Sequence, residues 1–357
     1  MMNPAYAQVI AASDADRLDM FLSTAGRLGT AVENVEKDFW VCWTLDALFN
    51  GPQDPHPRLL FKGGTSLSKC FGLIDRFSED IDITVFRDDL GQDATIEELE
   101  ALGTKRRRAR LDAIREACSV FINGAFLAGF AHTLTDTMTA ARVPSESYRV
   151  EADEADVDRQ TLLFWYPAVT AGAGDYIRSA VKIEAGAKSA LDPNVLTTVK
   201  PFVADALPEL DLRVADITTV QAQRTFWDKI VILHGLRTWH DRRGVLRHGG
   251  QRVSRHYYDV FRLLQSPEGE AAVADRELAG DCARHARMFF NNRDFDLDHA
   301  FPGTLTLTPS AAMLELLQRD YTAMAGMIMG AAPPLDQVMD AVSALERRLN
   351  VSEGGPA

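Results

Sequence analysis

The sequence predicts an α+β protein in which a mixed-sheet domain follows a helical lead-in and precedes a helical C-terminal domain. Short segments between residues 51 and 217 alternate apolar and polar residues, the period of a half-buried strand. From residue 218 onward apolar residues recur every three or four positions, as in helices. We therefore expect a lead-in at 1–50, a sheet domain at 51–217, a helical domain at 218–350 and a frayed tail at 351–357.

The individual elements follow from the same periodicities. Helices are expected at Asp14–Leu28 and Val32–Leu48, with Trp40 and Trp43 as core anchors. A proline-rich linker, Gly51–Pro57, leads into a strand at Leu59–Phe61. Further strands are predicted at Thr161–Tyr166, Tyr176–Glu184, Leu196–Pro201 and Asp211–Ile217. Helices are predicted at Thr218–His240, Ser254–Gln265, Glu268–Phe290, Ser310–Met329 and Leu335–Leu349. Because strands and helices do not alternate regularly, a mixed sheet is favoured.

A glycine pair follows the first strand. Gly63 and Gly64 predict a tight turn, after which Thr65 and Ser66 open a helical segment that reaches Ile74. Glycine lets the backbone approach an anion closely, and the free N–H groups at a helix start favour negative charge. The turn therefore predicts a phosphate-binding site, with the Ser66 hydroxyl as an added donor, although a glycine pair alone is more often only a turn.

Two acids lie on one face of the next strand. In the segment 80–85 polar and apolar residues alternate, so Asp80 and Asp82 point to one side while Ile81 and Ile83 enter the core. Neighbouring carboxylates attract Mg²⁺, and a two-ion site can clamp both the attacking and the leaving oxygen of a phosphoryl group. Asp-x-Asp by itself is usually a solvated face. Only fifteen residues separate Gly64 from Asp80, however, so turn and acids are expected to meet.

These residues resemble the first motif of the DNA polymerase β-type nucleotidyltransferase superfamily. More closely, Lys62–Lys69 and Arg76–Asp82 look like the AbiEii/AbiGii toxin family, the nucleotidyltransferase half of abortive-infection toxin–antitoxin pairs. The segment Val35–Trp40 is also similar to that family, and the likeness extends from about residue 30 to 330. The resemblance implies a polymerase β-like nucleotidyltransferase core.

Glu184 matches the third metal-facing acid of the superfamily. It lies in the alternating segment 180–185, which predicts a strand, and the resemblance implies that it orients or deprotonates the attacking hydroxyl. Lys182 shares its face, so an ordinary surface ion pair is the alternative.

Two later motifs also resemble the family. Lys229, on a predicted helix, matches a lysine that contacts the triphosphate, and Asp259 matches the acid of the last motif. Asp259 could order Lys229 or Arg255, could serve as a base, or could be a helix N-terminal charge. An insertion at 241–251 departs from compact family members and leaves the pairing of Asp259 with Lys229 open.

The resemblance implies transfer of a nucleoside monophosphate from an NTP to an acceptor hydroxyl, such as the tRNA 3′ end, with a winged-helix antitoxin as partner. Metal ligands would be Asp80, Asp82 and Glu184, holding Mg²⁺ or Mn²⁺. Lys229 and Asp259 would complete the catalytic set. The implied nucleotide-binding residues are Gly63, Gly64, Thr65, Ser66, Lys69, Arg76, Lys229 and Arg255. Two alternatives stay open, which are NMPylation of protein side chains and a non-catalytic nucleotide-binding module.

Composition sets the remaining bounds. The 357 residues are 46% hydrophobic and 25% charged, as in folded proteins, with a net charge of −13 that argues against nucleic-acid binding by the whole surface. Four scattered cysteines indicate neither a zinc site nor disulfides. No secretory signal or long apolar run is evident, so we expect a cytoplasmic protein without a membrane partner. Two basic segments stand out: 105–110, expected to be a solvated helix face, and 237–256, a candidate RNA or triphosphate contact.

Overall fold

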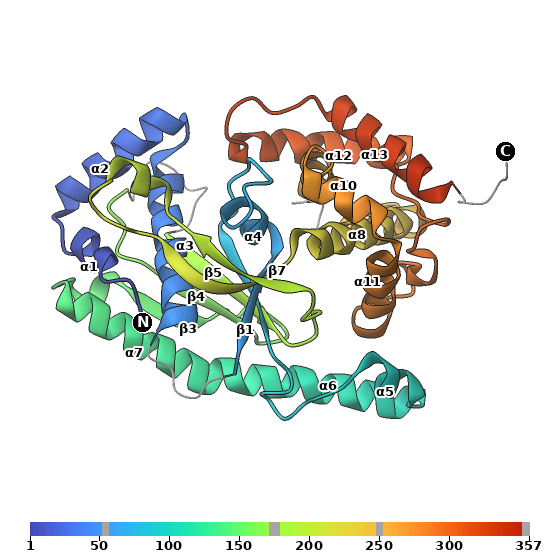
Figure 1. The fold of residues 1–357 in the computed structure, drawn as a ribbon, viewed down its shortest axis with the longest axis horizontal. Coiled ribbons are helices and arrows are strands. Elements are labelled where there is room, and N and C mark those ends of the chain that lie inside the picture. Colours follow the sequence, from blue (N-terminus) through green and yellow to red (C-terminus); the bar gives the residue numbers. More distant parts are fainter. Residues whose placement is uncertain (52–56, 171–178, 248–252, 352–357) are drawn as a thin grey trace. The chain divides into compact units, whose positions relative to one another are not determined.

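The computed structural model describes residues 1–51, 57–170, 179–247 and 253–351. These residues form two compact units (Figure 1). The first contains Met1–Cys70 and Phe77–Val220, and the second contains Phe71–Arg76 and Gln221–Ala357. The helical lead-in thus belongs to the same unit as the sheet, and a short segment just before Phe77 belongs with the C-terminal helices.

The first unit is built on a seven-stranded sheet with the order β3-β4-β5-β2-β1-β7-β6. Two strand pairs are parallel, β2 with β5 and β1 with β7, and the others are antiparallel. The predicted mixed sheet is therefore confirmed. The strands are β1 (Leu59–Lys62), β2 (Asp80–Val85), β3 (Arg149–Ala152), β4 (Thr161–Trp165), β5 (Ala180–Gly186), β6 (Asn194–Val199) and β7 (Val214–Val220).

One face of this sheet is apolar and is covered by α3 (Val32–Asn50). Ile81 and Ile83 of β2 are fully buried there, as the alternation predicted. Trp40 and Trp43 of α3 lie against Phe164 of β4, with ring centroids 5.9 and 5.4 Å away. The two tryptophans are therefore core anchors, and the apolar face of the central strands is fixed by packing. The opposite face is left for polar side chains.

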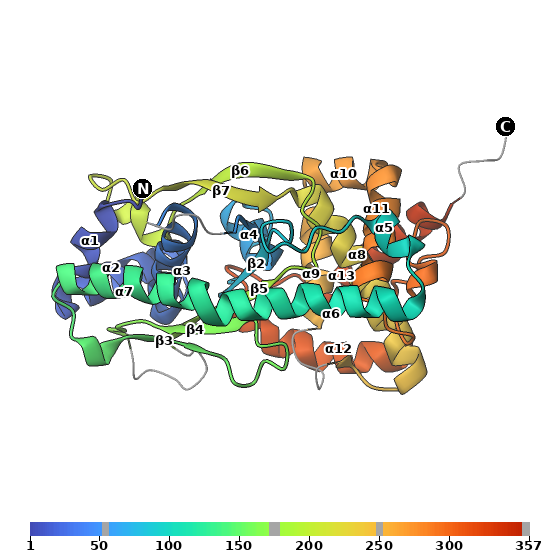
Figure 2. The same ribbon diagram turned by 90° about the horizontal axis from the view of Figure 1, so that it is seen from below.

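Helices complete the first unit. They are α1 (Ala5–Ile10), α2 (Asp14–Leu28), α4 (Gly63–Lys69), α5 (Ile96–Ala101), α6 (Thr104–Phe121) and α7 (Leu127–Ala140), with a π-helical turn at Ile122–Phe126 that joins the last two into one rod (Figure 2). The stretch Thr104–Ala140 is long and apolar enough to cross a membrane by length and composition, which is weak evidence because core helices pass the same test. A stripe that includes Ile114, Phe130 and Met138 is buried in the fold.

Among its described residues the second unit contains helices joined by loops and no named strand. Its α-helices are α8 (Ala222–Arg243), α9 (Ser254–Leu263), α10 (Pro267–Ala274), α11 (Arg276–Phe289), α12 (Ala311–Met324) and α13 (Leu335–Asn350). Tyr257 of α9 and Leu233 of α8 are fully buried in its core.

Several predicted elements need correction. The helix predicted from Thr218 starts at Ala222, because residues up to Val220 pair with β6. The helix predicted over Glu268–Phe290 is two helices, since the Asp275 carboxylate accepts the Leu278 N–H and starts α11. The helix expected to reach Ile74 ends at Lys69, ahead of Gly72 with φ +63°.

Other predictions were incomplete or cannot be compared. The edge strand β3 was not predicted, because its alternation of polar and apolar residues covers only four positions. The helix predicted over Ser310–Met329 ends as an α-helix at Met324. Parts of the predicted linker, of the strand expected from Tyr176, of the second basic segment and of the tail lie outside the described residues.

Candidate functional site

The polar face of the sheet carries a row of charged residues across three adjacent strands. In the antiparallel pair of β1 and β2, Lys62 is opposite Asp82, and in the parallel pair of β2 and β5, Asp82 is opposite Glu184. Asp80 is likewise opposite Lys182. Side chains at paired positions of neighbouring strands point to the same face. The register therefore places all three predicted acids on one side of the sheet, opposite the apolar face under α3.

The glycine turn is in direct contact with the second of these acids. Gly63 has φ +84°, a left-handed conformation that favours glycine. A Cβ atom at Gly63 would lie 2.1 Å from Oδ2 of Asp82. The carboxylate of Asp82 thus occupies the space that any other residue at position 63 would fill. The expected meeting of turn and acids is therefore present between Gly63 and Asp82.

The hydroxyl groups of Thr65 and Ser66, directly after the turn, form hydrogen bonds within the protein. The Thr65 hydroxyl donates to the Asp80 carbonyl at 2.5 Å and lies 2.8 Å from the Ser78 hydroxyl. The Ser66 hydroxyl donates to the Gly63 carbonyl at 3.0 Å, and both side chains are fully buried. These bonds fix the start of α4 against the beginning of β2. The Ser66 hydroxyl, expected to point at a phosphate, is instead bound to the turn itself.

Lys69 is also placed differently from the expectation. Its ammonium group donates to Asp38 of α3 at 2.6 Å and lies 4.0 Å from the centroid of the Phe202 ring, and its side chain is only 6% exposed. The other Asp38 oxygen accepts the Phe202 N–H at 2.6 Å. A lysine held in a buried pair of this kind anchors α4 to α3. We therefore leave Lys69 out of the phosphate site proposed below.

Asp38 is one of three consecutive charged residues of α3 that are buried and bind different segments. Glu36 accepts the Val169 N–H at 2.7 Å and bonds with Thr170. Lys37 donates to the Glu79 carboxylate at 2.5 Å, and Glu79 is the residue directly before Asp80 in the sequence. Burial raises the pKa of Glu36, although the N–H and hydroxyl donors oppose that shift. The segment Val35–Trp40, singled out by resemblance, thus holds the surroundings of the acidic face in place.

Glu184 is on the predicted face but its carboxylate is occupied. Lys182 donates to it at 2.6 Å, and the Lys182 ammonium lies 3.9 Å from Asp153. Burial alone would lower the pKa of Lys182, but the Glu184 carboxylate outweighs it and raises that pKa. In the part of the chain that the structure describes, no three His, Cys, Asp or Glu side chains are gathered closely enough to hold a metal ion. The three acids share a face without forming one ligand set.

Lys62 is a site residue that sequence reasoning did not assign. It lies in the row beside Asp82, at the end of β1 and directly before the glycine turn. Within the described ranges its side chain has no hydrogen bond or ion pair. The cation is therefore available to a ligand at the turn. The one signal in the sequence that could have identified Lys62 was its position at the start of the family-like segment Lys62–Lys69.

The second unit contains a separate buried cluster of charges. Arg76 donates to both oxygens of Asp259, at 2.7 and 2.8 Å, and Lys229 donates to Asp259 at 2.7 Å. Asp259 is completely buried, and Arg76 and Lys229 are 3% and 6% exposed. Of the alternatives for Asp259, the structure favours the ordering role, with Lys229 and Arg76 as its partners. Asp259 is neither an exposed helix-end charge nor open to act as a base.

The electrostatics of this cluster follow from its burial. Burial alone would raise the pKa of Asp259, but the Arg76 and Lys229 cations outweigh it and hold that pKa well below the usual range. Burial lowers the pKa of Lys229, the Asp259 carboxylate opposes this, and the Arg76 charge adds to the lowering. Arg255 is half-buried and close enough to contribute to the same shift. Two cations therefore share one anion.

The two basic segments are largely tied into the fold. In the first, Arg107 donates to carbonyl groups between α5 and α6, whereas Arg106 and Arg108 are exposed, as expected for a solvated face. In the second, Arg237 pairs with Asp241 at 3.0 Å and Arg243 with Asp294 at 2.5 Å. Residues 248–252 lie outside the described part of the chain, so the predicted RNA contact of this segment stays a prediction.

Comparison with known proteins identifies the family. The family model described as nucleotidyl transferase AbiEii toxin, type IV TA system, matches residues 46–344. No curated protein matches the sequence. Among solved structures the chain is similar to MenT4, a nucleotidyltransferase toxin from Mycobacterium tuberculosis H37Rv, with 16% identity, 92% of this chain and 97% of that chain covered and a TM-score of 0.37, a similarity that decides neither fold nor activity. The family match spans both units, and the chain belongs to the AbiEii family of nucleotidyltransferase toxins of type IV toxin–antitoxin systems.

Proposed function

We propose that the chain transfers a nucleoside monophosphate from an NTP to an acceptor hydroxyl in a magnesium-dependent reaction on the polar face of the sheet. The observation that carries the proposal is the row Lys62, Asp82 and Glu184 beside a turn whose Gly63 leaves room only for the Asp82 carboxylate. Family membership supplies the reaction type. The non-catalytic alternative is accordingly not retained.

The carboxylates on this face are the oxygen donors that a hard divalent cation prefers, and Glu184 would join Asp80 and Asp82 as a ligand once it is released from Lys182. Asp80 and Asp82 present carboxylate oxygens from alternate positions of one strand, and Glu184 is next to Asp82 on the adjoining strand. Mg²⁺ or Mn²⁺ held by these acids would neutralise charge on the transferred phosphoryl group. The N–H groups of Gly63 and Gly64 and the Lys62 ammonium are proposed to bind phosphate oxygens. Release of Glu184 from Lys182 would let its carboxylate accept the proton of the acceptor hydroxyl.

We further propose RNA as the acceptor, with the tRNA 3′ end as the first substrate to test, and a cytoplasmic location. Type IV toxin family membership implies an antitoxin partner, and a winged-helix protein is proposed in that role. For Lys229, Arg76 and Arg255 the family resemblance alone supports phosphate binding, since Lys229 and Arg76 are bound to Asp259 within the second unit. Support for the acceptor comes from the family likeness alone, and a protein acceptor is the competing outcome.

The experiment is incubation with α-labelled NTP, Mg²⁺ and cell extract, comparing the native chain with Asp82→Ala. Label on RNA that disappears with the variant supports the proposal. Asp211→Ala is the matched control, because Asp211 is an exposed acid of the same unit, paired only with neighbouring Arg213 among the described residues. Label on protein in place of RNA would mean that the acceptor is a protein side chain. Equal labelling by the native chain and Asp82→Ala would overturn the assignment of the site.

A further inference from the structure

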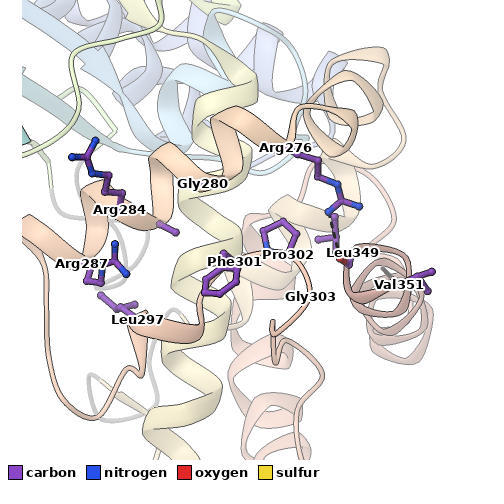
Figure 3. A pocket seen from close by; sticks show the side chains of 11 residues that line it. Arg276, Gly280, Arg284, Arg287, Leu297, Phe301, Pro302, Gly303, Leu349 and Val351 are labelled. Atoms are coloured by element: carbon purple, nitrogen blue, oxygen red, sulfur yellow. Dashed lines mark hydrogen bonds between the residues drawn. The ribbon is translucent and has the colours of Figure 1, made fainter. Parts of the chain in front are cut away.

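A pocket in the second unit is unrelated to any residue discussed so far. It has a volume of about 510 Å³, within the range of small-molecule and cofactor sites. One wall is α11, and the others are the segment Leu297–Gly303 and the end of α13 (Figure 3). Its lining combines arginine side chains with apolar groups.

The arginines form a stripe along α11. Arg276, Gly280, Arg284 and Arg287 all line the pocket, and their spacing of four, four and three residues places them on one face of the helix. The opposite face, including Cys282 and His285, is buried in the unit. Like charges three or four residues apart repel one another on a helix. A stripe of this kind is therefore expected to gain stability from an anion.

Arg276 and Arg287 of this stripe make only weak contacts with their neighbours. Arg287 lies 3.6 Å from Asp298, whose side chain is 77% exposed, so the pair is screened by solvent and easily exchanged. Arg276 donates to the Leu349 carbonyl at 3.4 Å, which fixes its direction and leaves other guanidinium N–H groups. Both arginines can therefore donate to phosphate oxygens without breaking a buried pair.

The centre of the pocket is apolar and open. Phe301, an exposed aromatic residue, lies between Arg287 on one side and Arg276 on the other (Figure 3). Leu297 and Val351 add apolar surface. No heavy atom lies within 4 Å of the position where a Cβ of Gly280 would be, so the helix wall is hollow at that point. A flat ring could enter beside Phe301.

We propose that this pocket binds single-stranded nucleic acid, with phosphates on the arginines and one base against Phe301. Residues eleven apart on a helix are separated by about 16 Å along its axis, further than neighbouring phosphates of one strand, so Arg276 and Arg287 suit two separate phosphates of a strand better than a single phosphate. Cationic grooves with aromatic platforms are the usual means of binding such strands. An acidic peptide would satisfy the arginines but leave Phe301 exposed. Only the identification of this strand with the acceptor RNA rests on the proposed function.

The test is binding of a fluorescein-labelled RNA of about eight nucleotides, a length typical of one such groove, by the full chain without NTP, followed by fluorescence anisotropy. The double variant Arg276→Glu/Arg287→Glu should raise Kd about tenfold or more. Phe301→Ala should raise it about fivefold or more, the loss expected for one stacked base. Gly280→Trp, which fills the pocket and keeps its charges, should weaken binding to a similar extent.

Two matched controls separate this site from general charge effects. Arg319→Glu changes an exposed arginine of α12 outside the pocket and should leave Kd within about twofold of the native value. Gly280→Ala adds a side chain where there is space and should bind normally. Thermal melts confirm that each variant is folded. Equal binding by the pocket variants and Arg319→Glu, or competition by polyglutamate at the concentration that suffices for unlabelled RNA, would overturn the proposal.

Further measurements distinguish an oligonucleotide from a free nucleotide as the ligand, and distinguish this inference from the proposed function. A nucleoside monophosphate should compete far less well than the oligonucleotide, and equal competition would identify a free-nucleotide site instead. NTP binding measured by calorimetry should be unchanged in the double variant. RNA that binds here and is never labelled contradicts the proposed acceptor only. RNA labelled at the native rate by a double variant that binds RNA weakly contradicts only the identification of the bound strand with the acceptor.

Discussion

The acidic face of the first unit and the charge cluster of the second unit contain the same residue types in opposite states. Asp80 and Asp82 are half-buried on a strand, next to the backbone of a glycine turn. Asp259 is fully buried and bound by two cations at 2.7–2.8 Å. A saturated buried carboxylate holds other side chains in place, whereas partly exposed acids that share one face can bind a ligand. We therefore propose that the first region carries the chemistry and that the second positions side chains.

The strongest test of this comparison is Asp82→Asn. The change keeps the shape of the side chain and removes its charge, so we expect labelling of the acceptor to fall by about a hundredfold to a thousandfold, the range for loss of one group that stabilises developing charge. The unfolding midpoint in urea should change little. Rates are measured with α-labelled NTP, and a variant with near-native rates would show that the acidic face is not the reaction site.

Asp259→Ala should instead act through stability. It leaves Arg76 and Lys229 buried without their counter-ion, and we expect a loss of about 3–5 kcal/mol in the free energy of unfolding. Urea denaturation measures this loss. Asp241→Ala is the control, because its pair with Arg237 is partly exposed and should contribute at most about 1 kcal/mol. Equal losses from the two changes would contradict a positioning role for the cluster.

Gly63→Ala should affect both properties moderately. The new Cβ would meet Oδ2 of Asp82 at 2.1 Å and would require a left-handed backbone at φ +84°. We expect a loss of about 1–3 kcal/mol in stability together with reduced labelling, since the Asp82 carboxylate must move. Gly26→Ala in α2, where nothing lies within 4 Å, should be neutral or stabilising by up to about 1 kcal/mol. Native activity in Gly63→Ala would show that the close approach of the Asp82 carboxylate to the turn at Gly63 is not needed for the reaction.

The pH dependence of unfolding distinguishes the two regions further. The pKa of Asp259 is lowered in the folded state, so its contribution to stability is complete above about pH 4, the unfolded value, and is lost as the pH falls through the lower folded value. Asp259→Asn removes this contribution. Stability of the native chain should therefore fall more steeply below about pH 4 than that of the variant. Parallel curves in acid would mean that Asp259 is not held ionised by its partners.

The smallest expected effect is that of Lys182→Met. Its ion pair with Glu184 is partly exposed, so stability should change by at most about 1 kcal/mol. Removal of the cation frees the Glu184 carboxylate, and we expect half-maximal labelling at a lower Mg²⁺ concentration. Glu184→Gln should do the reverse and lower the rate. If neither change alters the Mg²⁺ dependence, Glu184 is only the partner of a surface ion pair.

Local patterns in the sequence were sufficient for much of the fold. Both helices of the lead-in start at the predicted residues, and β2 has the predicted bounds, because helical periodicity and strand alternation depend on residues close together in the sequence. Element ends were predicted less well where tertiary pairing decides them. Thr218–Val220 was predicted as the start of a helix, yet it pairs with β6 and belongs to strand β7. The Asp275 cap likewise divides a continuous periodic stretch into two helices.

The sequence by itself determined the two acids on one face of β2, the glycine turn before them and the helical character of the C-terminal unit, since each depends on residues close together in the chain. Tertiary structure alone decided what each charge does. The strand register brings Glu184 beside Asp82, although a hundred residues separate them in the sequence. Lys69 is buried against α3 and pairs with Asp38, so it holds α4 to α3. Arg76 pairs with Asp259 within the second unit, although the two residues are far apart in the sequence. Whether a charged side chain can bind a ligand or forms an ion pair within the fold depends on its neighbours in space. The order of residues in the sequence does not specify those neighbours.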